Sequence, residues 1–273
     1  MKNFSTKRNF YWSTKTISLQ LVKFIRLYKK RPIKENINGA GFDNMFALYF
    51  ILKQIRPKFI VESGVLRGQT TWLIEKTLPK SKILSIDINL KNRKYISKKV
   101  KYSNIDFKLH NFYNIPKNTL VFLDDHQNHF ERLKQCKFFG IKNVILEDNY
   151  PVSRGDFYTI RHAIGKRGFN HPLRLLNILK TTYLFFLEIL KKKIFKNYYI
   201  SLDYINARLR DVAPNSYDFK TLCKNIQIYY EFPKLNNILK SLKKKKLYKL
   251  VEEINFLRTK SQSNNYLTFV KLK

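Results

Sequence analysis

The stretch "FIVESGVLRGQTTWLIEKTLPKSKILSIDINL", residues 59–90, decides the fold of this chain. Its first apolar run, "KFIVES", is too short for a helix and predicts a strand. "QTTWLIEKTL" then predicts a helix that closes at Pro79, and "KILSIDI" predicts a second strand. Two of the 8 glycines of the chain, Gly64 and Gly68, stand at the turn between the first strand and the helix. A strand, a glycine turn, a helix and a second strand form the opening unit of a parallel sheet.

The same alternation continues to about residue 150. Apolar or alternating runs predict further strands at 105–112, 119–126 and 143–149. Helical patterns precede and separate these runs, at 41–57 and in "FERLKQCKFFG", which ends at Gly140. This pattern predicts an α/β fold, a Rossmann-like, doubly wound and mostly parallel sheet.

After Pro151 the alternation stops, and the chain becomes basic and mostly helical. Strand patterns return only at 225–232 and 265–273, on either side of one Lys-rich helix. We expect four parts: a basic amphipathic helical segment, a Rossmann-like core, a helical insertion or lid after strand five, and C-terminal strands with a helix that return to the sheet edge. Their ranges are 1–40, 41–150, 151–224 and 225–273.

Charge does not identify a partner. The 54 Lys and Arg residues against 19 Asp and Glu residues give a net charge of +35, which suggests nucleic acid or an anionic membrane surface. Lys, Asn, Ile, Phe and Tyr are all abundant while Gly, Pro and Ala are scarce, however, as an AT-rich coding bias produces. The charge alone therefore leaves both partners open.

The expected location is cytoplasmic, with attachment to the inner face of a membrane left open. The two cysteines, Cys136 and Cys223, have no metal-type spacing and suggest a reduced setting. No stretch reaches the ~18 apolar residues of a membrane-spanning helix. Two basic helices, at about 15–30 and 173–196, fit either a protein core or the surface of an anionic bilayer. The oligomeric state is not indicated.

The first candidate site follows the first two expected strands. Ligands bind such sheets beyond the carboxyl ends of the strands, where Glu62, Gly64 and Gly68 follow the first strand and Asp87 follows the second. Gly64 lets the backbone turn sharply, and Gly68 lets a ligand approach the helix start. Dinucleotide sites favour GxGxxG because a pyrophosphate lies on backbone N–H groups. Here the pattern is ExGxxxG, and the Glu62 carboxylate suits a cationic nucleoside without phosphates, such as S-adenosylmethionine (SAM).

At these residues the chain resembles the class I SAM-dependent methyltransferases, whose first motif is an acidic residue followed by GxxxG. The resemblance covers about residues 40–150. It implies that Glu62 and the Gly64–Gly68 turn hold the methionine end of SAM and that Asp87 holds the ribose. It also implies that Asn111, after the expected third strand, lies on the adenine side, where the family often has Asp. Asp124 is a further expected SAM contact.

A second group of acids ends the fourth and fifth expected strands. Asp124, Asp125, Glu147 and Asp148 repel one another unless a cation lies among them, and Mg²⁺ takes one or two carboxylates plus waters. A bound metal lowers the pKa of a coordinated hydroxyl. A histidine with an ordinary pKa near 6.5 can then remove the proton, and His126 is preferred to His129.

These strand ends resemble those of the macrocin O-methyltransferase and cephalosporin hydroxylase-like group. The resemblance implies a Mg²⁺ site made of Asp124, Glu147 and Asp148. The Asp125-His126 pair, for which we expect a catalytic role, departs in register from the group's pattern. The alternative is that Asp124 or Asp125 contacts SAM or caps the next helix while the Glu147-Asp148 pair binds nearby lysines.

The resulting hypothesis is a SAM-dependent, Mg²⁺-assisted O-methyltransferase that acts on a hydroxyl of a small-molecule sugar or glycan precursor. One alternative is an RNA-binding protein or RNA methyltransferase, which the charge of +35 favours. Another is a non-catalytic Rossmann-like scaffold in a surface-glycan system.

Overall fold

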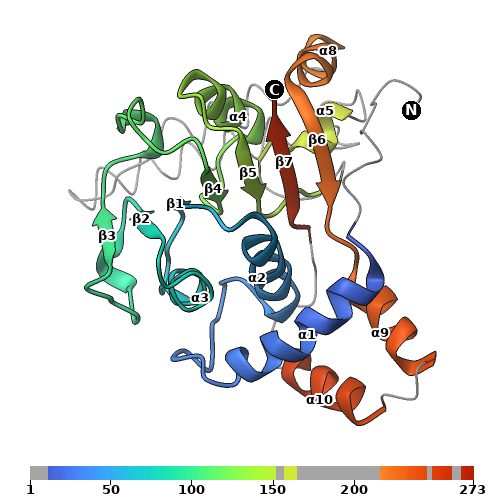
Figure 1. Cartoon of the computed structure of the whole chain (residues 1–273). Coiled ribbons are helices and arrows are strands. Elements are labelled where there is room, and N and C mark those ends of the chain that lie inside the picture. The colour runs from blue at the N-terminus through green and yellow to red at the C-terminus, as the bar shows by residue number, and fades with distance from the viewer. Residues whose placement is uncertain (1–11, 152–156, 165–215, 245–247, 260–265) are drawn as a thin grey trace, which may run out of the picture. The chain divides into compact units, whose positions relative to one another are not determined.

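The computed structural model describes residues 12–151, 157–164, 216–244, 248–259 and 266–273. These residues form a seven-stranded sheet in the order β3-β2-β1-β4-β5-β7-β6 (Figure 1). The strands are β1 Phe59–Ser63, β2 Lys82–Ile86, β3 Val100–Ser103, β4 Thr119–Leu123, β5 Asn143–Leu146, β6 Ile226–Glu231 and β7 Thr268–Leu272. The first five strands are parallel, and β7 runs antiparallel to β5 and β6. The order 3-2-1-4-5 is that of a doubly wound sheet, as predicted, and the C-terminal strands extend it at one edge.

The α-helices α3 and α4 connect β1 to β2 and β4 to β5, whereas the β2–β3 and β3–β4 connections contain only 3-10 turns. The helices of the described residues are α1 Thr14–Tyr28, α2 Phe42–Ile55, α3 Gln69–Thr77, α4 His129–Phe138, α5 Ile160–Ile164, α8 Ser216–Asn225, α9 Leu235–Lys244 and α10 Tyr248–Thr259, with the 3-10 turns η1 Leu90–Asn92 and η2 Phe107–Leu109. None of these helices is long and apolar enough to cross a bilayer.

The chain divides into two compact units. One unit contains Met1–His126, Leu133–Asn149 and Cys223–Lys273, and it holds the whole sheet. The other contains Gln127–Arg132 and Tyr150–Leu222. Most of the expected insertion, including the basic helix at 173–196, lies outside the described residues.

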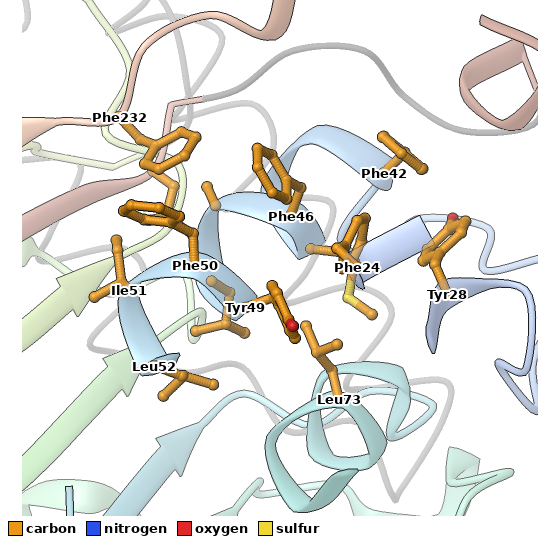
Figure 2. Packing of buried hydrophobic residues seen from close by; sticks show 14 of the residues in the cluster. Phe24, Tyr28, Phe42, Phe46, Tyr49, Phe50, Ile51, Leu52, Leu73 and Phe232 are labelled. Carbon is orange, nitrogen blue, oxygen red and sulfur yellow. The ribbon is translucent and has the colours of Figure 1, made fainter. Parts of the chain in front are cut away.

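Helix α2 is buried on all sides and forms the centre of the core. Every residue from Phe42 to Leu52 is buried, because the sheet covers one side of the helix and α1, α3 and α10 pack against others. Figure 2 shows Phe46 and Phe50 of α2 beside Phe232. A fully buried side chain of this size contributes about 1.5–3 kcal/mol. The core therefore holds α2 rigidly against the sheet.

The apolar face of α1 belongs to this core. Ile17, Leu21 and Phe24 are buried, and the Phe24 ring lies 5.4 Å from the Phe46 ring. The amphipathic pattern at 15–30 is thus explained by packing inside the protein. Of the two alternatives left open for this helix, the structure supports the protein core, since these apolar side chains are buried.

Two local predictions were wrong. The third strand is Val100–Ser103 rather than 105–112. The alternation that suggested 105–112 arises because Phe107 and Phe112 are both buried, with their rings 5.1 Å apart. The single Lys-rich helix is two helices, α9 and α10.

The acidic start of α2 does not cap the helix. Gly41 occupies the N-cap without a side-chain hydrogen bond. Asp43 instead accepts two hydrogen bonds from the Arg258 guanidinium of α10, at 2.8 and 2.9 Å. Burial raises the pKa of Asp43, and Arg258 opposes that increase. This bidentate pair ties α10 to the start of α2.

Candidate functional site

Most of the predicted site residues lie at the carboxyl ends of the parallel strands, which we call the carboxyl edge of the sheet. The parallel ladder continues one residue past each strand, so that the N–H groups of Gly64, Asp87, Asp124 and Glu147 donate to carbonyls of the neighbouring strand at 2.7–3.0 Å. Strands β1, β2, β4 and β5 therefore end in line. Because side chains alternate along a strand and the strands pair in register, four acids fall on the α2 side of this edge. They are Glu62, Asp87, Asp124 and Glu147.

Glu62 has a buried carboxyl group, and one of its two oxygens accepts hydrogen bonds. Its Oε2 accepts hydrogen bonds from the Thr71 hydroxyl at 2.6 Å and the Ser85 hydroxyl at 2.5 Å. Its Oε1 is buried and has no hydrogen-bond partner among the described residues. Burial raises the pKa of Glu62 from 4.5 to about 7, hydroxyl donors oppose the increase, and the Asp87 charge adds to it. A cation beside Oε1 would return this carboxyl group to its ionised form.

Asp87 closes the glycine turn. Its Oδ2 accepts hydrogen bonds from the backbone N–H groups of Val65 and Leu66 at 2.9 and 3.0 Å, and its Oδ1 accepts from Asn89 N–H at 2.8 Å. The two turn N–H groups on which a pyrophosphate would lie are therefore taken by a protein carboxylate. Oδ1 accepts a single bond, so Asp87 keeps a free lone pair for a ligand hydroxyl.

The two glycines allow other backbone segments of the protein to pack closely against them. Gly64 has φ +98°, and a Cβ there would lie 2.0 Å from the Asp124 carbonyl oxygen. Gly68 has φ +85°, and a Cβ there would lie 2.8 Å from the Tyr95 carbonyl oxygen. Gly64 makes the sharp turn that the sequence predicted. The room over Gly68, where we expected a ligand to approach, is taken by the Tyr95 backbone.

Asp124 and Glu147 form the second half of the edge. Burial and then the Asp148 charge raise the pKa of Asp124 well above its ordinary range, while His126 lowers it. Burial and the charges of Asp124 and Asp148 likewise raise the pKa of Glu147. Without a cation, therefore, these acids favour their protonated forms.

One group of side chains at this edge has the geometry of a metal site. Asp124, His126 and Asp148 each offer a ligand atom, and these atoms all lie within 4.8 Å of one another. His126 Nε2 lies 4.0 Å from Asp148 Oδ2. Both His126 and Asp148 have left-handed backbones, with φ +53° and +54°. Such strain in non-glycine residues is held in place by the surrounding structure and is common at functional sites.

This group differs in one member from the predicted metal ligands, which stay a prediction. It contains Asp124 and Asp148, whereas Glu147 is not in it. Glu147 is buried, and its Oε1 accepts a hydrogen bond from the Asn44 amide of α2. His126, predicted as the catalytic base, is half-exposed and takes the third place.

The two other catalytic candidates, Asp125 and His129, are not members of this group. Asp125 points to the opposite side of the sheet from Asp124, where its Oδ2 accepts a hydrogen bond from the Ser63 hydroxyl at 2.6 Å. His129 belongs to the other compact unit, is buried, and packs its ring 4.9 Å from that of Phe157.

The structure does not bring Asn111 to this edge. Asn111 is exposed and lies beside a pocket lined by Phe59 and Lys82, the first residues of β1 and β2. Its predicted role depended on a third strand at 105–112. The residues that do follow β3 are Asn104, Ile105 and Asp106.

Several residues at the edge escaped the sequence reasoning. Asn44 Oδ1 and both polar atoms of the Gln69 side chain are buried without hydrogen-bond partners in the part of the chain described. Ile88, directly after Asp87, is 74% exposed, and Ile105 is 50% exposed. Only Ile88 could have been found from the sequence, because an apolar residue directly after a strand-end acid is unusual and indicates a functional surface.

Comparisons with known proteins give distant structural likenesses. No protein-family model matches the chain, and no curated protein is significantly similar to it. Similar solved structures include SAH-bound CmcI, at 18% identity over 40% of this chain and 62% of that chain, with a TM-score of 0.37. They also include the SAH-bound methyltransferase PaMTH1 of Podospora anserina, at 15% identity over 53% of this chain and 66% of that one, with a TM-score of 0.36.

A form of CmcI with Mg and SAM matches at 18% identity over 52% of this chain and 68% of that chain, with a TM-score of 0.33. The match to apo CmcI spans 52% of that protein's length. The likeness is too distant to assign a function, which has to be argued from the site itself.

Proposed function

We propose that this chain is a SAM-dependent O-methyltransferase. The observation that carries the proposal is the buried Glu62 carboxyl, with an unpartnered oxygen and a pKa of about 7, beside the glycine turn closed by Asp87. Such a carboxyl suits a cation. The turn's N–H groups are occupied by Asp87, which disfavours a pyrophosphate ligand. A cationic, phosphate-free nucleoside meets both conditions.

The residues of the edge fit the three parts of SAM. Glu62 would hold the positively charged methionine end through Oε1, its atom without a partner. Asp87 has acceptor capacity left for a ribose hydroxyl. The exposed Ile88 and Ile105 offer apolar surface to a base. SAM supplies, when bound, a methyl group on a sulfonium that transfers to an oxygen nucleophile.

The second half of the edge would prepare that nucleophile. Mg²⁺ prefers oxygen ligands, so the carboxylates of Asp124 and Asp148 suit it. The imidazole of His126 is then left beside the metal ligands, where it accepts the proton of the acceptor hydroxyl. One lone pair on Nε2 cannot serve both a metal and a proton, so this division of roles excludes His126 as a ligand.

For the acceptor we propose a hydroxyl of a sugar or glycan precursor. Its support is the pairing of a metal group with a histidine, an arrangement that lowers the pKa of an unactivated hydroxyl and removes its proton. Positioning and electrostatics would supply most of the rate acceleration.

The test of the cofactor is calorimetric titration of the protein with SAM and, separately, with NAD at pH 7.5. We expect SAM to bind and NAD not to bind. Because Glu62 must ionise to bind a cation, SAM affinity should rise as pH increases through about 7, and Glu62→Gln should abolish that pH dependence. No SAM binding, or equal binding of NAD, overturns the proposal.

The acceptor is tested separately, with SAM that carries an isotope-labelled methyl group. Label is expected in a sugar or glycan fraction, lost in Asp148→Asn and strongly reduced in His126→Ala. Label in RNA would favour the RNA methyltransferase alternative. SAM binding without transfer to any fraction would favour a non-catalytic role.

A further inference from the structure

A cavity lies on the other side of the sheet from Glu62, at the opposite ends of the strands. Its volume is about 510 Å³, and it is lined by residues of β1, β2 and β3 and of the β2–β3 and β3–β4 connections. Phe59 and Lys82 are the first residues of their strands, whereas the candidate site follows the last. Strand β1 alone separates the two places by roughly 13 Å. This cavity is therefore distinct from the methyl-transfer edge.

The cavity exists because no α-helix of the β3–β4 connection covers this part of the sheet. That connection, residues 104–118, is described throughout and contains only the 3-10 turn η2. Leu84 pairs with Lys101, so the two side chains lie on the same face. Phe112 and Ile115 of the connection also line the cavity.

The rim of the cavity is strongly and uniformly basic. Its lining includes Lys82, Lys98, Lys99 and Lys101 and contains no acidic residue. The four lysine side chains make no hydrogen bond or ion pair with any described residue, and all four residues are exposed. Four ammonium groups around one hollow repel one another unless an anion lies among them.

The floor of the cavity is apolar. Phe59, Leu84 and Phe112 contribute to it, and His110 stacks on Phe112 at 5.6 Å. A volume of this size is typical of small-molecule sites. An apolar floor beneath a cationic rim suits a ligand that has a ring or apolar body and more than one negative charge.

We infer that this cavity binds an organic diphosphate, with its phosphates on the lysine rim and its body on the apolar floor. The inference does not rest on the proposed methyl transfer, since SAM carries no phosphate. A single-stranded nucleic acid would share the phosphate chemistry. The volume of about 510 Å³ and the four lysines at its rim favour the small ligand.

The test uses uridine diphosphate and inorganic pyrophosphate as probes in calorimetric titrations at 0.15 M salt. Uridine diphosphate should bind more tightly than pyrophosphate, because only the former has a body for the floor, and both should weaken as salt increases. Saturation with SAM should leave this binding unchanged. The pocket variant Lys82→Ala with Lys101→Ala should weaken binding about tenfold.

A second pocket variant, Lys98→Ala with Lys99→Ala, should act in the same direction. The matched control is Lys240→Ala with Lys249→Ala, which removes the same charge from exposed positions on α9 and α10 and should change affinity less than about twofold. Thermal unfolding checks that all variants fold. Equal losses in the control and the pocket variants, no binding of uridine diphosphate, or binding of a single-stranded RNA oligonucleotide alone would each overturn the inference.

Discussion

The two halves of the carboxyl edge handle negative charge in opposite ways. At β1 and β2 the protein supplies its own donors, since hydroxyl groups bind Glu62 and backbone N–H groups bind Asp87. At β4 and β5 the acids of Asp124, Glu147 and Asp148 mostly face one another, and burial and mutual repulsion raise the pKa of Asp124 and Glu147. The first half is organised in advance, whereas the second half calls for an external cation. Four variants test this contrast, from the largest expected effect to the smallest.

Gly64→Ala should destabilise the protein most, because Gly64 joins the halves. The new Cβ would clash with the Asp124 carbonyl oxygen and occupy a left-handed backbone. Overpacking costs about 1–3 kcal/mol and the left-handed backbone roughly 1–2 kcal/mol more, as measured by urea unfolding. Gly140→Ala is the control, since Gly140 has φ +70° but open space around it and should lose only the backbone contribution. An equal loss of unfolding free energy in Gly64→Ala and Gly140→Ala would mean that Gly64 is not tightly packed against the Asp124 backbone.

Glu62 should make the stability of the first half depend on pH. Its folded pKa of about 7 lies above its ordinary value of 4.5, so the native state holds an extra proton between these values. Its contribution is complete below pH 4.5 and is lost as pH rises through 7, a change of roughly 3 kcal/mol. Urea unfolding at pH 5 and pH 8.5 measures this slope. Glu62→Gln should remove it, whereas Glu252→Gln, an exposed change on α10, should leave it intact.

Asp87→Ala should open the glycine turn. It removes the acceptor of three backbone N–H groups, and hydrogen bonds to a charged group contribute about 1.5–3 kcal/mol when buried. Because Asp87 is partly exposed, we expect a loss of about 2 kcal/mol in urea unfolding. Asp106→Ala, which removes the side-chain acceptor of the Lys108 N–H group after β3, should cost less than half as much. A smaller effect at Asp87 than at Asp106 would contradict a preorganised first half.

Mg²⁺ or Mn²⁺ should stabilise the second half. A cation at ten times its dissociation constant adds about 1.4 kcal/mol, or about 3 to 5 °C in Tm. Chelation should reverse the shift, and Asp148→Asn should abolish it, because that change removes one of the grouped carboxylates. The control Glu252→Gln should keep the full shift. The contrast between the halves is contradicted if the cation does not raise Tm. It is also contradicted if the cation raises the Tm of Asp148→Asn as much as that of the unchanged protein.

The chemical character of the site could be read from the sequence because it depends on residue type and order. Short apolar runs end in acids at Glu62, Asp87, Asp124 and Glu147, and parallel strands must end at a common edge. Period-two and helical patterns likewise located most strands and helices. These are local properties, because the residue at the carboxyl end of a strand is fixed by the sequence and does not depend on which elements pack against the strand.

The partners of those acids were decided only by the tertiary structure. Asp87 binds the turn rather than leaving all of its acceptors to a ligand, Asn44 reaches Glu147 from α2, and His126 joins Asp124 and Asp148 in place of Glu147. Each contact joins segments far apart in sequence or depends on which side of the sheet a residue faces. A shift of one residue moves a side chain to the other face, as Asp124 and Asp125 illustrate. Strand pairing sets that choice, and the pattern of a single segment does not contain it.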